Sequence, residues 1–169
     1  MSQTIVPDHP APAVASRPPR RVLVSYEPSK RGHAALRHAI SLARASGSRL
    51  IVTAVVPRAP VTGCARCRQS AVLWNHEMRS VASEELADAA RLVGESGDVE
   101  YVPSYGELLP ATAQAAERCA ADVIVVPEQP TGLRRLFSAR IAEKLRDRGD
   151  WEVIVAPDCD RAPDAPVRP

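Results

Sequence analysis

Hydrophobic residues follow two alternating patterns along the chain. Short runs rich in valine, leucine and isoleucine predict strands, and the stretches between them, in which apolar residues recur every three or four positions, predict helices. The predicted strands are Arg21–Tyr26, Arg49–Val56, Val99–Val102, Val123–Val126 and Glu152–Ala156. The predicted helices are Ser29–Ser46, Ala71–Val93, Glu107–Ala120 and Leu136–Arg148. This alternation favours an α/β fold with an open parallel sheet and helices on both faces.

Local signals mark several ends of these elements. Ser29 is expected to cap the first helix and Gly47 to end it, because serine favours the N-cap and glycine the left-handed conformation that follows a helix. Residues 57–70 are expected to form a loop, since prolines and a glycine interrupt both patterns there. The apolar residues of the long helix that follows share one face: Trp74, Met78, Val81, Ala82, Leu86, Ala89 and Val93.

Proline divides the chain into three parts. Of 16 prolines, five lie in residues 1–20 and four in residues 157–169, whereas the segment between has an ordinary content. Proline-rich ends of this kind are typical of disordered tails. We therefore expect disordered tails over 1–20 and 158–169 around a single domain over 21–157, which is long enough to bury a hydrophobic core.

Charge and composition exclude several classes of protein. The formal net charge is only +2, from 22 basic and 20 acidic residues, and six residues are aromatic, so nucleic acid binding is not indicated. No apolar run is long enough to span a membrane, and no signal peptide is evident. A cytoplasmic protein with reduced cysteines is expected. Neither a nucleophile elbow nor a Walker loop is present, so the chain is not expected to be an enzyme.

Two stretches resemble a known family. Arg21–Pro57 is similar to the opening of a universal stress protein domain, and Ala120–Pro157, with the phrases ADVIVV and IAEKL, is similar to its close. The resemblance implies a Rossmann-like sheet of five strands in the order 3-2-1-4-5. It also implies a homodimer formed through the last strand, Glu152–Ala156, and a regulatory or stress-response role with an unknown protein partner. Some members of the family bind ATP and others do not.

The chain departs from the pattern of the ATP-binding members. Those members carry an aspartate after the first strand and Gly-x2-Gly-x9-Gly after the fourth, because glycines let the backbone approach phosphates and offer N–H donors. The corresponding positions here are Glu27, Pro127, Pro130 and Arg140, with Val55 at the end of the second strand. Proline has no N–H, so two lost donors would cost about 3–6 kcal/mol. ATP binding is therefore expected to be weak or absent.

Basic residues leave a second interpretation open. Lys30 and Arg31 lie in the first turn of the first helix, where cations oppose the helix dipole, and Arg134 and Arg135 lie near the last helix. An anionic ligand would explain them, because their side chains can donate to phosphate. On this alternative the chain is a nucleotide-responsive binding module with a degenerate site lined by arginine.

A cysteine pair leaves a third interpretation open. Cys64 and Cys67 have the spacing of a chelating or redox pair, and His76 follows nine residues later. A zinc site needs four ligands, and a second pair of this kind is missing. The motif also does not follow the first predicted strand and is not expected to open a helix, as a thioredoxin site does. Three interpretations of the pair stay open: ordinary thiols, a metal site and a reversible disulfide.

Overall fold

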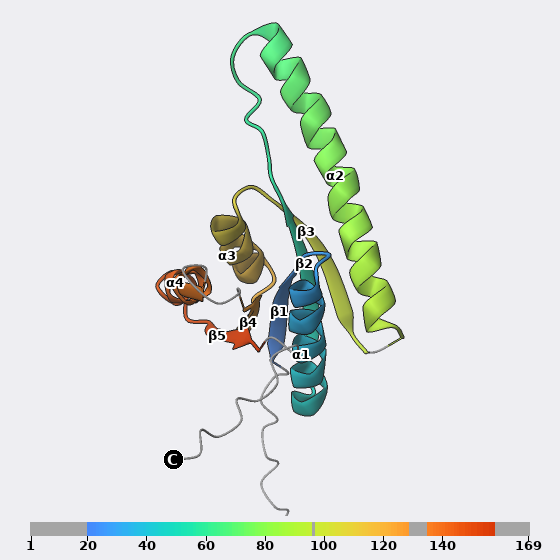
Figure 1. Cartoon of the computed structure of the whole chain (residues 1–169), viewed down its shortest axis with the longest axis vertical. Helices are drawn as coiled ribbons and strands as arrows, with labels where there is room; N and C mark the ends of the chain where they lie inside the picture. The colour runs from blue at the N-terminus through green and yellow to red at the C-terminus, as the bar shows by residue number, and fades with distance from the viewer. Residues whose placement is uncertain (1–19, 96, 129–134, 158–169) are drawn as a thin grey trace, which may run out of the picture.

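The computed structural model describes residues 20–95, 97–128 and 135–157, which form a five-stranded sheet covered by four helices (Figure 1). The predicted tails lie outside these residues, except for Arg20. The elements follow in the order β1 (Arg21–Tyr26), α1 (Lys30–Ser46), β2 (Arg49–Val56), α2 (Ala65–Val93), β3 (Val99–Tyr105), α3 (Leu108–Arg118), β4 (Val123–Pro127), α4 (Arg135–Arg146) and β5 (Glu152–Ala156).

The strands pair in the order β3-β2-β1-β4-β5, and every pairing is parallel. Val22 of β1 is in register with Leu50 of β2 on one side and with Val123 of β4 on the other. The strand order predicted from the family resemblance is therefore confirmed. After β3 the chain crosses to the other side of β1, so the carboxyl ends of β1 and β4 flank the switch point where ligands bind in such sheets.

The core has two layers because successive side chains of a strand point to opposite faces of the sheet. Val22, Val24 and Tyr26 pack with α1 and α2 on one face, whereas Leu23 packs with α3 and α4 on the other. The central strands are buried on both faces, as expected of a parallel sheet between helices. Between β2 and β3, the buried hydroxyls of Thr53 and Ser104 form a hydrogen bond of 2.9 Å.

Helix α2 begins at Ala65, so the expected loop over residues 57–70 is wrong in its second half. Cys64 caps the helix, since its Sγ accepts a hydrogen bond from the backbone N–H of Cys67. At about 1.5 Å per residue the 29 residues of α2 span about 43 Å, roughly twice the length of the strands. Its amino-terminal half consequently projects beyond the sheet (Figure 1).

The projection changes which apolar residues reach the core. Leu86, Ala89 and Val93, in the carboxyl-terminal half of α2, are buried, but Trp74 is 44% exposed. Only the carboxyl-terminal half of the expected apolar face is therefore buried, because no sheet lies beneath the first turns of α2. None of the helices within the described part of the chain combines the length and apolar character needed to cross a membrane.

Candidate ligand site at the carboxyl edge of the sheet

A cavity of about 220 Å³ opens at the carboxyl ends of β1, β2 and β4. It combines apolar side chains with carboxylates and hydroxyls, and its lining consists of Ser25, Tyr26, Glu27, Val55, Glu85, Leu108, Thr112, Val126, Pro127, Ile141 and Leu145. The structure thus brings together three residues that the family resemblance assigned to the degenerate site: Glu27, Val55 and Pro127.

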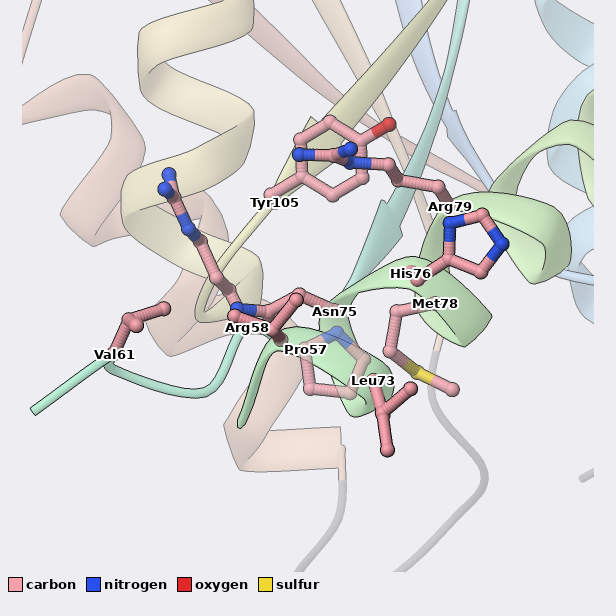
Figure 2. Close-up of a pocket in the computed structure, with 10 residues that line it drawn as sticks. Pro57, Arg58, Val61, Leu73, Asn75, His76, Met78, Arg79 and Tyr105 are labelled. Carbon is pink, nitrogen blue, oxygen red and sulfur yellow. The ribbon is translucent and has the colours of Figure 1, made fainter. Parts of the chain in front are cut away.

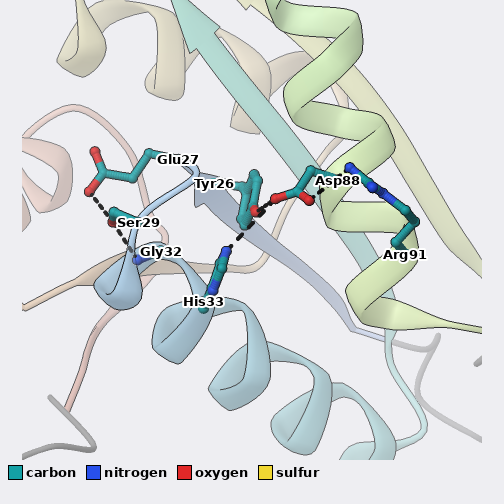
Figure 3. A network of polar contacts seen from close by, with 7 residues as sticks. All are labelled: Tyr26, Glu27, Ser29, Gly32, His33, Asp88 and Arg91. Carbon is teal, nitrogen blue, oxygen red and sulfur yellow. Dashed lines mark hydrogen bonds and ion pairs between the residues drawn. The ribbon is translucent and has the colours of Figure 1, made fainter.

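The turn from β1 into α1 positions Glu27. Ser29 caps α1 by accepting a hydrogen bond of 3.0 Å from the backbone N–H of Gly32, and its hydroxyl donates to Glu27 Oε1 at 2.8 Å (Figure 3). A Cβ at Gly32 would lie 2.0 Å from the carbonyl oxygen of Glu27, so only glycine lets the helix approach this closely. The cap and the close approach together position Glu27 in the lining of the cavity.

A second carboxylate, Glu85 of α2, lines the same cavity. Burial raises the pKa of Glu85 above its usual value, and the negative charge of Glu27 raises it further. The sequence did not reveal Glu85 as a site residue, because it lies within a long helix and belongs to no motif. The cavity is therefore more acidic than Glu27 alone indicated.

Two buried hydroxyls complete the polar lining. Ser25 of β1 is 7% exposed and Thr112 of α3 is 2% exposed. Among the residues that the structure describes, Thr112 Oγ1 is buried without a hydrogen-bond partner. An unpartnered buried hydroxyl beside a cavity is suited to hydrogen bonding with a ligand or a bound water molecule. Thr112 also escaped sequence reasoning, since it lies in an alanine-rich helix.

Behind the cavity, a polar network joins β1, α1 and α2 (Figure 3). The Tyr26 hydroxyl donates a hydrogen bond to Asp88 Oδ2, and the Tyr26 ring stacks on His33 with centroids 5.9 Å apart. His33 Nε2 lies 3.8 Å from Asp88 Oδ2, and Arg91 Nη2 donates to Asp88 Oδ1 at 3.0 Å. The bond from Tyr26 lowers the pKa of Asp88, and burial followed by that bond raises the pKa of Tyr26.

The basic residues expected to compensate for the lost glycines do not line this cavity where the structure describes them. Lys30 and Arg31 lie in the first turn of α1, and Arg140 is exposed on α4, but none of the three belongs to the lining. The other predicted positions lie outside the described residues or side chains: Pro130, Arg134 and the side chain of Arg135.

A second cavity, of about 360 Å³, lies between the connection after β2 and the projecting half of α2. Figure 2 shows Arg58, Arg79 and His76 around it, with Tyr105 at the end of β3. Asn75 ties the connection to the helix, because its side-chain oxygen accepts from Ala59 N at 2.8 Å and its amide nitrogen donates to Ala59 O at 2.9 Å. These two hydrogen bonds join the connection to the projecting half of α2.

The cysteine pair lies at the tip of that segment. Cys64 and Cys67 are exposed and their sulfur atoms are 2.8 Å apart. Since Cys64 caps α2, the pair does open a helix, contrary to that part of the expectation, but it follows β2 and not the first strand. His76 lies nine residues further along the same helix, about 13.5 Å from Cys67 along the axis, so it does not join the pair. Among the described residues, no three metal-ligating side chains form a group.

Comparison with known proteins agrees with this fold. Residues 19–157 match the model of the universal stress protein family. No curated protein sequence matches the chain. Universal stress protein UspA from Lactobacillus plantarum superposes with a TM-score of 0.66 at 17% identity, covering 82% of this chain and 97% of that one.

Two further similar structures are nucleotide complexes. A universal stress protein in complex with cAMP has a TM-score of 0.59 and 19% identity, covering 82% of this chain and 97% of that one. The Archaeoglobus fulgidus universal stress protein in complex with dAMP has a TM-score of 0.56 and 20% identity, covering 82% and 98%. At these identities the likeness shows the Rossmann-like fold. The family model, which spans most of the chain, goes further and shows that the chain belongs to the universal stress protein family.

Proposed function

We propose that this universal stress protein is a non-enzymatic regulatory module whose cavity binds ATP weakly or not at all. The observation that carries the proposal is the pair of carboxylates, Glu27 and Glu85, in a cavity whose described lining contains no lysine or arginine. A triphosphate brings several negative charges, which these carboxylates repel, and the low dielectric of a partly enclosed site strengthens the repulsion.

The backbone of the cavity supports the same conclusion. Pro127 lines it at the end of β4 and has no N–H to donate to a phosphate. The volume of about 220 Å³ is also below the roughly 300–1,000 Å³ of sites that hold drug-sized ligands. Both features favour a ligand smaller and less negative than ATP.

A non-enzymatic role is supported by what lines the cavity. Its described lining contains no histidine, lysine or cysteine, the side chains that most often serve as acid–base groups or activated nucleophiles near neutral pH. The relatives in complex with cAMP and dAMP indicate that related folds hold small nucleotides. We infer that this chain uses the family's fold as a signalling scaffold with an acidic cavity.

The proposal includes a cytoplasmic homodimer formed through β5. This strand lies at an edge of the sheet, where unpaired backbone groups can pair with a second copy. Ile154 and Val155 of β5 are only half-buried within one chain. Light scattering on the purified chain is expected to give twice the monomer mass, and Val155→Lys is expected to reduce it to that of the monomer.

Isothermal titration with ATP tests the central proposal. We expect no saturation below about 1 mM ATP. Glu27→Gln/Glu85→Gln removes both carboxylates and is expected to bind ATP roughly tenfold more tightly than the wild type. Glu77→Gln/Glu84→Gln is the matched control. Both of these glutamates are exposed on α2, the helix that carries Glu85, and replacing them changes the net charge by the same amount.

A micromolar dissociation constant for the wild type would overturn the proposal. Analysis of the supernatant after denaturing freshly purified protein complements the titration, because it detects a nucleotide that co-purifies. Released adenine nucleotide would instead support the nucleotide-responsive module.

A further inference from the structure

The tip of the projecting segment holds two thiols in contact at the start of a long helix. Cys64 is the N-cap of α2 and Cys67 is its third residue, with 2.8 Å between the two sulfur atoms. In a disulfide this distance is about 2.05 Å, so a small side-chain rotation brings the sulfurs into bonding range. This geometry is independent of the cavity at the carboxyl edge of the sheet and of the function proposed for it.

The surroundings of Cys64 stabilise a thiolate. Cys64 Sγ accepts a hydrogen bond of 3.3 Å from the backbone N–H of Cys67 at the positive end of the helix dipole. The hydrogen bond from the Cys67 thiol, followed by that from its backbone, lowers the pKa of the Cys64 thiol. A thiolate is the form of cysteine that attacks a disulfide.

The charge at the tip is of one sign. Arg66 lies between the two cysteines and Arg68 directly follows them, and no aspartate or glutamate occurs between Glu27 and Glu77 in the sequence. The first turn of α2 likewise carries no acidic residue. Positive charge around the thiols both favours the thiolate and attracts an anionic reagent.

The tip is also accessible and held in shape. Residues 61–70 are all exposed. Gly63, at φ +87°, makes the turn into the helix in a conformation that side chains rarely adopt, and its carbonyl accepts a hydrogen bond of 2.7 Å from Arg68. Asn75 joins the preceding connection to α2 through two hydrogen bonds, and the thiols beyond it face solvent.

We propose that Cys64 and Cys67 form a redox-active dithiol that undergoes thiol–disulfide exchange with small disulfides bearing carboxylates. The Cys64 thiolate attacks one sulfur of the disulfide, giving a mixed disulfide and releasing one thiolate. Cys67 then loses its proton and attacks Cys64 Sγ, which closes the protein disulfide and releases the second thiolate. Two protein thiols are oxidised, the small disulfide is reduced to two thiols, and those thiols take up the two protons.

Equilibration of the full chain with mixtures of reduced and oxidised glutathione tests this chemistry. We expect the chain to lose two hydrogen atoms in one reversible transition. Intact mass spectrometry at each ratio of reduced to oxidised glutathione measures this loss. Trypsin cleaves after Arg66, between the cysteines, so the Cys64 and Cys67 peptides remain joined only if the disulfide has formed. Cys64→Ser is expected to abolish the transition while keeping the helix capped, because serine is a good N-cap.

Charge selectivity is tested by comparing 3,3′-dithiodipropionate with cystamine, with each rate normalised to that of 2-mercaptoethanol, a thiol without a charged group. The wild type is expected to prefer the anionic disulfide several-fold, and Arg66→Glu/Arg68→Glu to lose that preference. Arg37→Glu, an exposed arginine on α1, is the control and should keep it. The proposal fails if no Cys64–Cys67 disulfide forms in oxidised glutathione, or if either cysteine pairs with Cys159 instead. Equal rates for both disulfides would overturn the assigned class of substrate.

Discussion

Gly32 shows how a single residue can decide the geometry of the candidate site. A glycine inside a helix looks like a weakness from sequence, because it costs about 1 kcal/mol relative to alanine. In the structure it allows α1 to approach the carbonyl group of Glu27, which leaves no room for a side chain. Sequence patterns describe the propensity of one residue, and they do not describe what the neighbouring backbone will occupy.

The substitution Gly32→Ala distinguishes these two effects by sign. Helix propensity alone predicts stabilisation, whereas the close approach predicts a loss of about 1–3 kcal/mol in the free energy of unfolding. We expect the loss, measured by urea denaturation. Ser41→Ala, an exposed position on the same helix, is the control and should change the stability little. A gain in stability for Gly32→Ala would contradict the described approach of α1 to Glu27.

At the scale of elements, the strands were predicted more accurately than the helices. The bounds of β1, β2 and β5 agree with the prediction to the residue, because each is an apolar run between charged or turn-forming residues. The start of α2 was missed because cysteine is not among the residues that usually cap helices. Trp74 belongs to the predicted apolar face but is 44% exposed, since helical spacing does not reveal whether a sheet lies beneath the helix.

The buried pair between β2 and β3 gives a prediction for a sheet edge. Thr53→Val alone leaves the buried hydroxyl of Ser104 without its partner, so it should cost about 1–3 kcal/mol of stability. Thr53→Val/Ser104→Ala removes both hydroxyls and should cost less than the single substitution. Chemical denaturation of the wild type and both variants measures this. Additive costs, with the double variant the least stable, would show that the hydrogen bond does not link the strands.

At the scale of the whole molecule, the sequence located part of the candidate site. Glu27, Val55 and Pro127 were predicted because the family resemblance places them at or just after the carboxyl ends of β1, β2 and β4. Glu85 and Thr112 were not, because they come from helices packed on opposite faces of the sheet and only the tertiary fold brings them together. The acidity of the cavity is consequently a property of the fold rather than of any motif.

The network around Asp88 joins three elements and makes stability depend on pH. The pKa of Asp88 is lowered in the folded state, so the folded state releases the Asp88 proton more readily than the unfolded chain does. The ionised carboxylate therefore stabilises the fold at pH values above its ordinary pKa of 3.8. This contribution is lost as the pH falls through the lower folded value. Asp88→Asn should therefore be less stable than the wild type at pH 7.

Urea unfolding across a pH series measures this effect. The difference between Asp88→Asn and the wild type should shrink steadily below about pH 4. Asp147→Asn, at an exposed position, is the control and should follow the wild type throughout. A difference that stays constant with pH would mean that Asp88 acts through its shape and not through its charge.

The projecting half of α2 also affects how the mass of this protein in solution should be measured. A helix of about 43 Å, half of which extends beyond a small domain, increases hydrodynamic drag beyond that of a sphere of 18.2 kDa. A monomer is therefore expected to elute early from a gel-filtration column and to be mistaken for a dimer. Sedimentation equilibrium, which depends on buoyant mass and not on friction, separates an elongated monomer from a true pair of chains.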